Sequence, residues 1–502
     1  MSEKVKINNK KFESLKHTNI IRLLSTLNKY EFNLLVRWVD SPAHNLREDL
    51  KVYIKYLKKI HPKFEDKHLQ KGEIFEILYP DKKYNDSTIR RLNNMLIDII
   101  EEFISYLKFR QDSYLHNKLI LDHYVKSNDF KLTDKQFEKV SEILEKTKSK
   151  DSEYHQRKTE LLEIERSYKL KNDPTYKSIG YESQISHTVK YFLESVMRLY
   201  GFSEYEKYFF NKKYDAELKE EVLKIIESKD YLNDLKLHIY YRIIKLYESE
   251  EINNKIIEVK NLILNNLDNF SREESFNLFI HLFNGININK LKTNFDFSEI
   301  EFEITMNMIE NNLIEFNGVI DAGWFRGLFF KIYNARKYDV AKWYLDTYKN
   351  KINSEDKESI SNHLNALISF GLKNYDEALK YLEMASYNGI NDKWLVKNLF
   401  LKIYFETGEY ERFNYVADSI RHLIKDNNVW NENITSPIRN FINLTDRVFK
   451  IKIGDRSEDL DEIKDKIGKT EMIGRNWLLE KTEELRREKN GDESEGSRHD
   501  GI

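Results

Sequence analysis

The stretch KNYDEALKYLEMA, residues 373–385, is the most regular part of the sequence. Tyr375 is followed three residues later by Ala378, and Leu382 comes four residues after that. Spacings of three and four residues place side chains on one face of an α-helix. The stretch therefore predicts a helix whose packed face combines small and apolar residues.

The same pattern occurs three times in the C-terminal third of the chain, as RKYDVAKWYLDTY, KNYDEALKYLEMA and GEYERFNYVADSI. Each copy has a Tyr followed by an acidic residue, and the spacings between Tyr338, Tyr375 and Tyr410 are 37 and 35 residues. A repeat of this length is typical of helix pairs that stack on one another, because each pair leaves an apolar side that only a neighbouring pair can cover.

The segment NYDEALKYLEMA resembles the second helix of a tetratricopeptide repeat, a helix–turn–helix unit of about 34 residues. Gly408-Glu-Tyr410 is similar to the Gly-x-Tyr of that family at the turn between the two helices, whereas Arg336 and Lys373 replace the glycine in the other copies. The resemblance covers residues 320–425. It implies a right-handed α-solenoid of stacked antiparallel helix pairs.

The composition also predicts an all-α fold. The 502 residues include 16 Gly and 5 Pro, well below the average usage of about 7% and 5%, and these residues punctuate strands and turns. Without any cysteine, the chain cannot form disulfides, thiol nucleophiles or Cys-type zinc sites. No signal peptide or apolar run of about 20 residues is visible, so we expect a cytoplasmic protein without a membrane partner.

Four segments follow from the patterns along the chain. We predict a basic N-terminal helical domain over residues 1–110, irregular helical repeats over 111–300, tetratricopeptide-like repeats over 301–486 and a disordered polar tail over 487–502. The layout also resembles uncharacterised bacterial helical proteins. Residues 1–110 hold 22 Lys and Arg against 15 Asp and Glu, a net charge of +7, and the remainder carries a net charge of −9.

The basic segment contains one candidate DNA-recognition helix, DSTIRRLNNML, residues 86–96. Asn85 or Asp86 can cap its start, and Arg90 and Arg91 follow near the N-terminal end. Two features oppose this role. The link from the preceding helix is longer than the ~3–4 residues of a helix-turn-helix motif, and the predicted helix continues through acidic residues at 101 and 102.

The sequence contains no motif typical of catalysis. Neither Gly-x-Ser-x-Gly nor Gly-x-Gly-x-x-Gly occurs, and Ile463 stands where a phosphate-binding loop ending at residues 468–470 would need its first glycine. Glu65 and His68 form one Glu-x-x-His motif, whereas a di-iron bundle needs two. We therefore expect no catalytic residues, no metal site and no cofactor.

The resemblance also implies a peptide-binding groove, because the first helix of each tetratricopeptide pair lines the concave face. Counting back from each turn Tyr gives its inward positions: Arg326, Phe330, Tyr333, Asn334, His363, Leu367, Phe370, Asn398, Lys402 and Phe405. Aromatic side chains alternate there with hydrogen-bond donors, including His363 when protonated, and no acidic residue is present. Such a surface suits the carbonyls or carboxylates of an extended peptide.

Two functions fit these features. The first is a non-enzymatic scaffold or adaptor that binds a protein or peptide segment of acidic character on its concave face. The alternative is a repeat-type regulatory sensor in which residues 1–110 bind DNA or a regulator protein. Binding to nucleic acid across a salt series distinguishes the two, because phosphate contacts make affinity fall steeply with salt.

Overall fold

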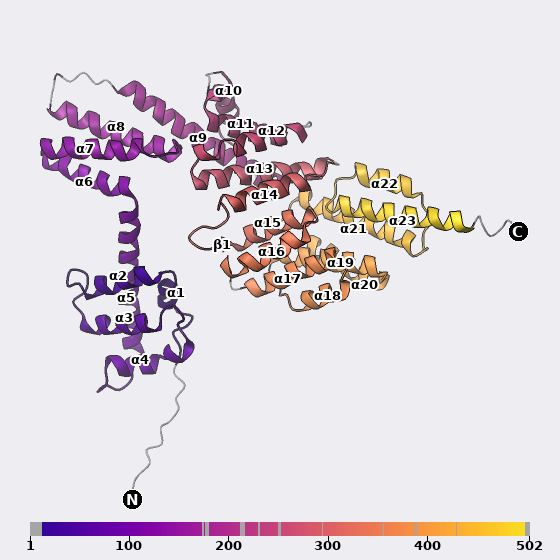
Figure 1. Cartoon of the computed structure of the whole chain (residues 1–502), viewed down its shortest axis with the longest axis horizontal. Helices are drawn as coiled ribbons and strands as arrows, with labels where there is room; N and C mark the ends of the chain where they lie inside the picture. The colour runs from indigo at the N-terminus through magenta and orange to yellow at the C-terminus, as the bar shows by residue number, and fades with distance from the viewer. Residues whose placement is uncertain are drawn as a thin grey trace, which may run out of the picture. The chain divides into compact units, whose positions relative to one another are not determined.

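The computed structural model describes residues 13–172, 175, 180–210, 216–228, 231–248, 253–293, 295–354, 356–386, 389–427 and 429–496. These described residues form 23 α-helices and one parallel pair of two-residue strands (Figure 1). The predicted all-α fold is confirmed.

The chain divides into two compact units, Met1–Lys146 and Thr147–Ile502. From residue 13 onward the first unit has seven α-helices: α1 (Asn19–Ser25), α2 (Lys29–Asp40), α3 (Glu48–Ile60), α4 (Lys71–Leu78), α5 (Asp86–Gln111), α6 (Ser113–Ser127) and α7 (Phe130–Glu145). The segment boundaries that the sequence suggests at residues 110, 300 and 486 stay predictions.

Local signals in the sequence explain where helices of the first unit begin. The Asn28 side chain accepts hydrogen bonds from the backbone N–H groups of Tyr30 and Glu31, and the Glu31 carboxylate accepts one from the Asn28 N–H, which completes a capping box. The Asn85 side chain caps α5 by accepting hydrogen bonds from the backbone N–H groups of Ser87 and Thr88. As predicted, α5 continues past the acidic residues at 101 and 102, and its Arg90 pairs with Asp86 at 2.6 Å.

The second unit holds the remaining helices. They are α8 (Ser152–Asn172), α9 (Tyr181–Phe209), α10 (Lys219–Ser228), α11 (Leu235–Glu248), α12 (Asn253–Leu264), α13 (Arg272–Lys292), α14 (Ser298–Glu310), α15 (Ala322–Asn334), α16 (Tyr338–Tyr348), α17 (Lys357–Gly371), α18 (Tyr375–Glu383), α19 (Ile390–Thr407), α20 (Tyr410–Lys425), α21 (Glu432–Lys452), α22 (Leu460–Lys469) and α23 (Arg475–Gly496). The two short strands are β1 (Ile320–Asp321) and β2 (Ile352–Asn353). Helix α23 includes the beginning of the predicted polar tail, and residues 497–502 lie outside the described residues.

The three sequence copies correspond to three helical hairpins, α15–α16, α17–α18 and α19–α20. Each second helix begins at the repeated Tyr, namely Tyr338, Tyr375 or Tyr410. The residue two positions before each Tyr has positive φ: 60° at Arg336, 63° at Lys373 and 78° at Gly408. Arg336 and Lys373 thus adopt the left-handed conformation that glycine favours at a helix C-terminus. Helix α15 packs on α17, and α17 packs on α19 (Figure 1).

The small residues of the repeated pattern, Ala341, Ala378 and Ala417, are all buried, as is expected where helices approach closely.

Helix α19 is shared between two hydrophobic cores of the second unit. Core residues of α19 divide between the two clusters: Val396, Leu399 and Ile403 belong to one, and Trp394, Leu401 and Phe405 belong to the other.

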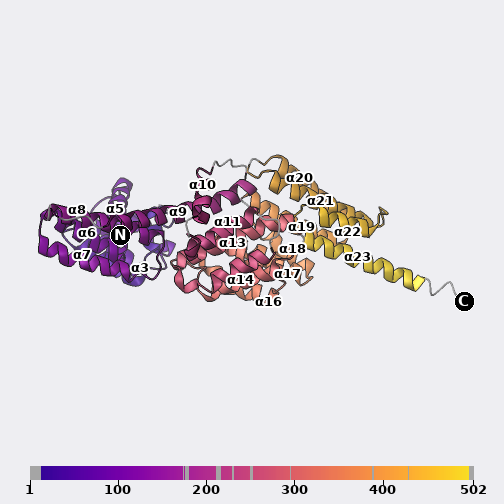
Figure 2. The same cartoon turned by 90° about the horizontal axis from the view of Figure 1, so that it is seen from above.

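Contacts between residues distant in the sequence join earlier and later helices of the second unit. The side-chain amide of Asn431, just before α21, donates hydrogen bonds to the carbonyl oxygens of Tyr208 and Phe210 at the end of α9, both at 3.0 Å. Asn433 donates to the Tyr208 carbonyl as well. Figure 2 shows α21, α22 and α23 side by side. At the start of α23, Arg475 donates a hydrogen bond to the carbonyl oxygen of Thr293.

Candidate functional site

A cavity of about 710 Å³ lies within the second unit, where segments distant in the sequence meet. Its walls come from the end of α9, the end of α13 and its connection to α14, helices α15 to α19, and the starts of α21 and α23. Aromatic side chains form much of the lining: Tyr205, Phe209, Phe295, Phe297, Tyr333, Tyr338, Phe370, Tyr375 and Trp477. The volume falls in the range of about 300–1,000 Å³ that is usual for ligand sites.

The charged side chains of the lining are mostly cationic. Lys290, Arg336, Lys373, Lys402, Arg475 and Lys481 face three carboxylates, those of Asp296, Glu406 and Glu480. Several of these cations are already paired. Lys290 binds Glu301, Arg336 binds Glu480 and Lys481 binds Glu406. Lys373 and Lys402 have no carboxylate within ion-pair distance in the described part of the chain, so the cavity carries uncompensated positive charge.

Lys402 is the more enclosed of these two lysines. Its ammonium group lies 5.1 Å from the ring centroid of Trp477 and 5.9 Å from that of Phe441, within range of a cation–π interaction. Burial lowers the pKa of Lys402 to about 8, and the nearby Glu406 carboxylate opposes that shift. Glu406 itself is held by Lys481 at 2.9 Å. Lys402 is therefore a cation in aromatic surroundings, available to an anion that enters the cavity.

Four residues predicted for the groove line this cavity together. They are Tyr333 and Asn334 from α15, Phe370 from α17 and Lys402 from α19. The helical count from the repeated Tyr thus brings one cation, one amide and two aromatic rings to the same cavity.

Arg326, Phe330 and His363 lie elsewhere. Arg326 forms an ion pair with Asp392. The ring of Phe330 packs at 6.2 Å from that of His363. Burial, and then the charge of Arg326, lower the pKa of His363 to about 4, so at neutral pH this side chain is uncharged and is not the protonated donor that the sequence suggested.

Leu367, Asn398 and Phe405 also lie outside this cavity. Phe405 is 1% exposed and packs at 5.0 Å from the ring of Phe449, and Leu367 is buried in the other core of the unit. The Oδ1 atom of Asn398 is buried and has no hydrogen-bond partner among the described residues. These three side chains do not line the cavity.

Sequence patterns did not indicate the walls contributed by α9 and α23. Tyr205, Phe209 and Trp477 come from helices outside the repeated pattern. Their meeting with α15 and α17 depends on contacts such as the one between Arg475 and Thr293, 182 residues apart. No local spacing in the sequence indicates such a contact.

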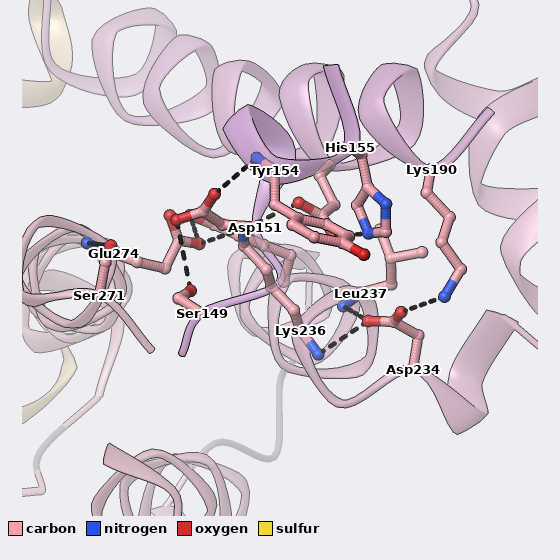
Figure 3. Close-up of polar contacts among 12 residues, drawn as sticks. Ser149, Asp151, Tyr154, His155, Lys190, Asp234, Lys236, Leu237, Ser271 and Glu274 are labelled. Atoms are coloured by element: carbon pink, nitrogen blue, oxygen red, sulfur yellow. Dashed lines mark hydrogen bonds and ion pairs between the residues drawn. The ribbon is translucent and has the colours of Figure 1, made fainter. Parts of the chain in front are cut away.

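A second group of polar residues is buried between α8, α9, α11 and α13 (Figure 3). Lys236 donates to Glu194 at 2.9 Å and lies 3.3 Å from Glu274, which also accepts a hydrogen bond from the Tyr240 hydroxyl at 2.9 Å. Asp234 pairs with Lys190 at 3.0 Å and caps the start of α11 (Figure 3).

Burial changes the protonation of this buried group. It raises the pKa of Glu194 to about 7, against the opposing charge of Lys236. It also lowers the pKa of His155 to about 4, and His155 lies 2.7 Å from His187 between their Nδ1 atoms. Because the charges of this group pair with one another, we assign it a structural role in joining the four helices.

Two further observations concern metal binding and membrane-spanning helices. In the described ranges, no three His, Asp or Glu side chains gather in a way that could hold a metal ion. None of the helices described there is both long and apolar enough to cross a membrane.

Comparisons of the chain with protein-family models, curated proteins and solved structures find no match.

Proposed function

We propose that this chain is a non-enzymatic binding protein whose cavity takes an acidic peptide segment of a partner. The proposal rests on Lys402, a lysine without a carboxylate partner in the described chain, enclosed by aromatic rings on the wall of a cavity with excess positive charge. A carboxylate that enters would recover the ion pair that Lys402 lacks. The aromatic walls would hold the apolar side chains of the peptide.

We further propose that the three hairpins form part of a right-handed, tetratricopeptide-like solenoid. Two observations support this arrangement. The first helices of successive hairpins pack on one another, and each repeated Tyr begins a second helix after a residue of positive φ. In such an array the first helices line the inner side, which agrees with the position of Tyr333, Phe370 and Lys402 on one cavity.

Binding of short peptides to the full chain tests the function. Three pools of fluorescein-labelled hexapeptides are compared by fluorescence anisotropy: one rich in Asp and Glu, one neutral and one rich in Lys. We expect the acidic pool to bind most tightly and its affinity to fall with salt. Lys402→Met should weaken that binding about tenfold or more, in the range of a lost buried charge pair. Lys380→Met, on the exposed surface of α18, is the matched control.

The proposal fails if a folded Lys402→Met variant binds the acidic pool as tightly as the natural chain and with the same salt dependence. The alternative function, a sensor in which residues 1–110 bind DNA, predicts a different result. The full chain would then bind duplex DNA with an affinity that falls steeply with salt and does not respond to Lys402→Met. In the structure, Arg90 of the candidate recognition helix is paired with Asp86, which leaves Arg91 as its neighbouring exposed cation.

A further inference from the structure

A separate groove of about 530 Å³ lies between α19 and α20. Its floor is apolar and consists of Val396, Phe400, Tyr404 and Val416. Positions 400 and 404 lie on the side of α19 opposite Lys402, because two residues correspond to about 200° around a helix. The groove is thus distinct from the cavity, and its role is independent of peptide binding at Lys402.

The groove lies where the two hydrophobic cores of the unit meet. Phe400 packs against one core, and Tyr404 and Val416 pack against the other. The rings of Phe400 and Tyr404 stack with their centroids 6.0 Å apart, and Tyr415 at the edge is 79% exposed. The lining is mostly apolar and aromatic, and aromatic residues are enriched at the interfaces between proteins.

The two edges of the groove differ in charge. On the α20 edge, Glu411 contributes a carboxylate, and Arg412 is paired with Glu409 at 2.7 Å and lies over the Tyr404 ring. On the α19 edge, Lys393 and Lys397 lie one turn apart, and neither has a carboxylate within ion-pair distance among the described residues. Lys397 donates only to the hydroxyl of Ser419. The unmatched positive charge is therefore on the α19 edge.

The length of the groove fits a helix. From Lys393 to Tyr404 the floor follows α19 for eleven residues, a rise of about 16 Å or three helical turns. Two neighbouring helices form a trough into which the side-chain ridge of a third helix can pack. We propose that this groove binds an amphipathic helix of a partner protein, with apolar residues at i, i+3 or i+4 and i+7 on the floor and two acidic residues one turn apart facing Lys393 and Lys397.

The test is a selection of 16-residue peptides from a displayed random library on the full chain. We expect the selected sequences to show the apolar spacing above, with Asp or Glu at i and i+4. One selected peptide is then synthesised. Its affinity is measured by fluorescence anisotropy, and its helix content, free and bound, by circular dichroism. The peptide should gain helix content when it binds.

Two pairs of variants locate the site. Tyr415→Ala and Lys393→Glu should each weaken binding of the peptide about tenfold or more, as expected for an aromatic anchor and for a reversed charge. Tyr30→Ala, at a tyrosine that is 70% exposed in the first unit, and Lys425→Glu, on the exposed end of α20, should leave the affinity unchanged. All four positions are exposed, so the variants should fold.

Four results would overturn the proposal. Selection could yield no sequence with the helical spacing, or a peptide that binds without gaining helix content. The selected peptide could bind Tyr415→Ala and Lys393→Glu as tightly as the natural chain. Light scattering could also show a dimer that Tyr415→Ala dissociates, which would assign the groove to a second copy of this chain instead.

Discussion

Tyr338 and Gly371 approach so closely that a Cβ atom on Gly371 would lie 2.5 Å from Cε1 of Tyr338. Tyr338 begins α16 and Gly371 ends α17, so the contact joins one hairpin to the next. The other repeated tyrosines also reach the helix that follows their own hairpin. Burial, and then the charge of Glu406 on α19, raise the pKa of Tyr375 to about 12. The Tyr410 hydroxyl donates to Asp446 on α21 at 2.9 Å.

Gly371→Ala should destabilise the protein. The added methyl group must displace the Tyr338 ring, and such overpacking costs about 1–3 kcal/mol. Gly327→Ala is the control, since Gly327 lies within α15 and has no atom within 4 Å of an added Cβ. That variant should gain up to about 1 kcal/mol, because alanine favours a helix. Urea unfolding measures the free energy of unfolding of both variants. Equal changes in the two would show that the contact with Tyr338 does not limit the size of the side chain at position 371.

Lys373→Gly should stabilise the protein. Lys373 has φ of 63°, a conformation that costs a residue with a side chain about 1 kcal/mol or more and costs glycine little. The gain should appear as a higher urea midpoint with an unchanged slope. Lys380→Gly, within α18, is the control and should lose about 1 kcal/mol, because glycine is unfavourable inside a helix. A loss of stability in both variants would contradict the cost that we assign to the left-handed conformation of Lys373.

Lys402→Met should stabilise the protein at neutral pH while it weakens anion binding. The pKa of Lys402 is about 8 in the folded chain and about 10.5 when unfolded, so below pH 8 the folded state holds a charge in unfavourable surroundings. Removal of that charge should add about 1–2 kcal/mol to the free energy of unfolding. The gain over the natural chain should shrink as pH rises from 8 to 10.5, since Lys402 is then neutral. A gain independent of pH would contradict this assignment.

Binding of acidic hexapeptides should also depend on pH. The protonated form of Lys402 attracts the carboxylate, so the affinity should be constant below pH 8 and fall above it as the free lysine loses its proton. Isothermal titration between pH 6 and pH 10 measures this change. An affinity that does not fall above pH 8 would mean that another cation holds the ligand.

His281→Leu should leave stability unchanged or raise it. His281 is fully buried, and neither ring nitrogen has a hydrogen-bond partner among the described residues. An unsatisfied buried polar group costs about 1–3 kcal/mol, and leucine has a similar volume. Burial, and then the charge of Arg198, lower the pKa of His281 to about 3. The natural chain should therefore lose stability relative to His281→Leu as pH falls below 6.5, because only the unfolded chain gains the proton.

His281→Ala is the matched comparison for that experiment. It removes the same nitrogens but leaves a cavity beside Gly201, whose added Cβ would lie 2.6 Å from Nδ1 of His281. We expect a loss of about 2–4 kcal/mol in thermal unfolding. Equal losses in the leucine and alanine variants would mean that His281 has a partner, such as a buried water.

Local patterns in the sequence predicted the helices well. The Tyr375, Ala378 and Leu382 spacing gives a helix that begins at Tyr375 with both other residues buried, and Asn85 caps the start of α5. These predictions agree with the structure because hydrogen bonds and packing faces within a helix depend on residues three and four positions apart.

The candidate site was predicted only in part, because its walls depend on contacts over long distances in the sequence. Lys402 and Phe370, two positions of the inward count, line the cavity, and the count reaches them from helix periodicity alone. It also assigns Phe405 to the surface, although a second core covers that side of α19. Helix periodicity indicates which residues share a face of a helix, but it does not indicate which other segments cover that face.

The hydrogen bonds from Asn431 to the end of α9 have a consequence for synthesis on the ribosome. Their partners at Tyr208 are 223 residues earlier in the chain. At about 5–20 residues per second, Tyr208 is added to the chain roughly 10–45 s before Asn431. Until then the backbone carbonyls of α9 and the aromatic residues beside them are without this cover, and a chaperone or a neighbouring nascent chain could bind there first.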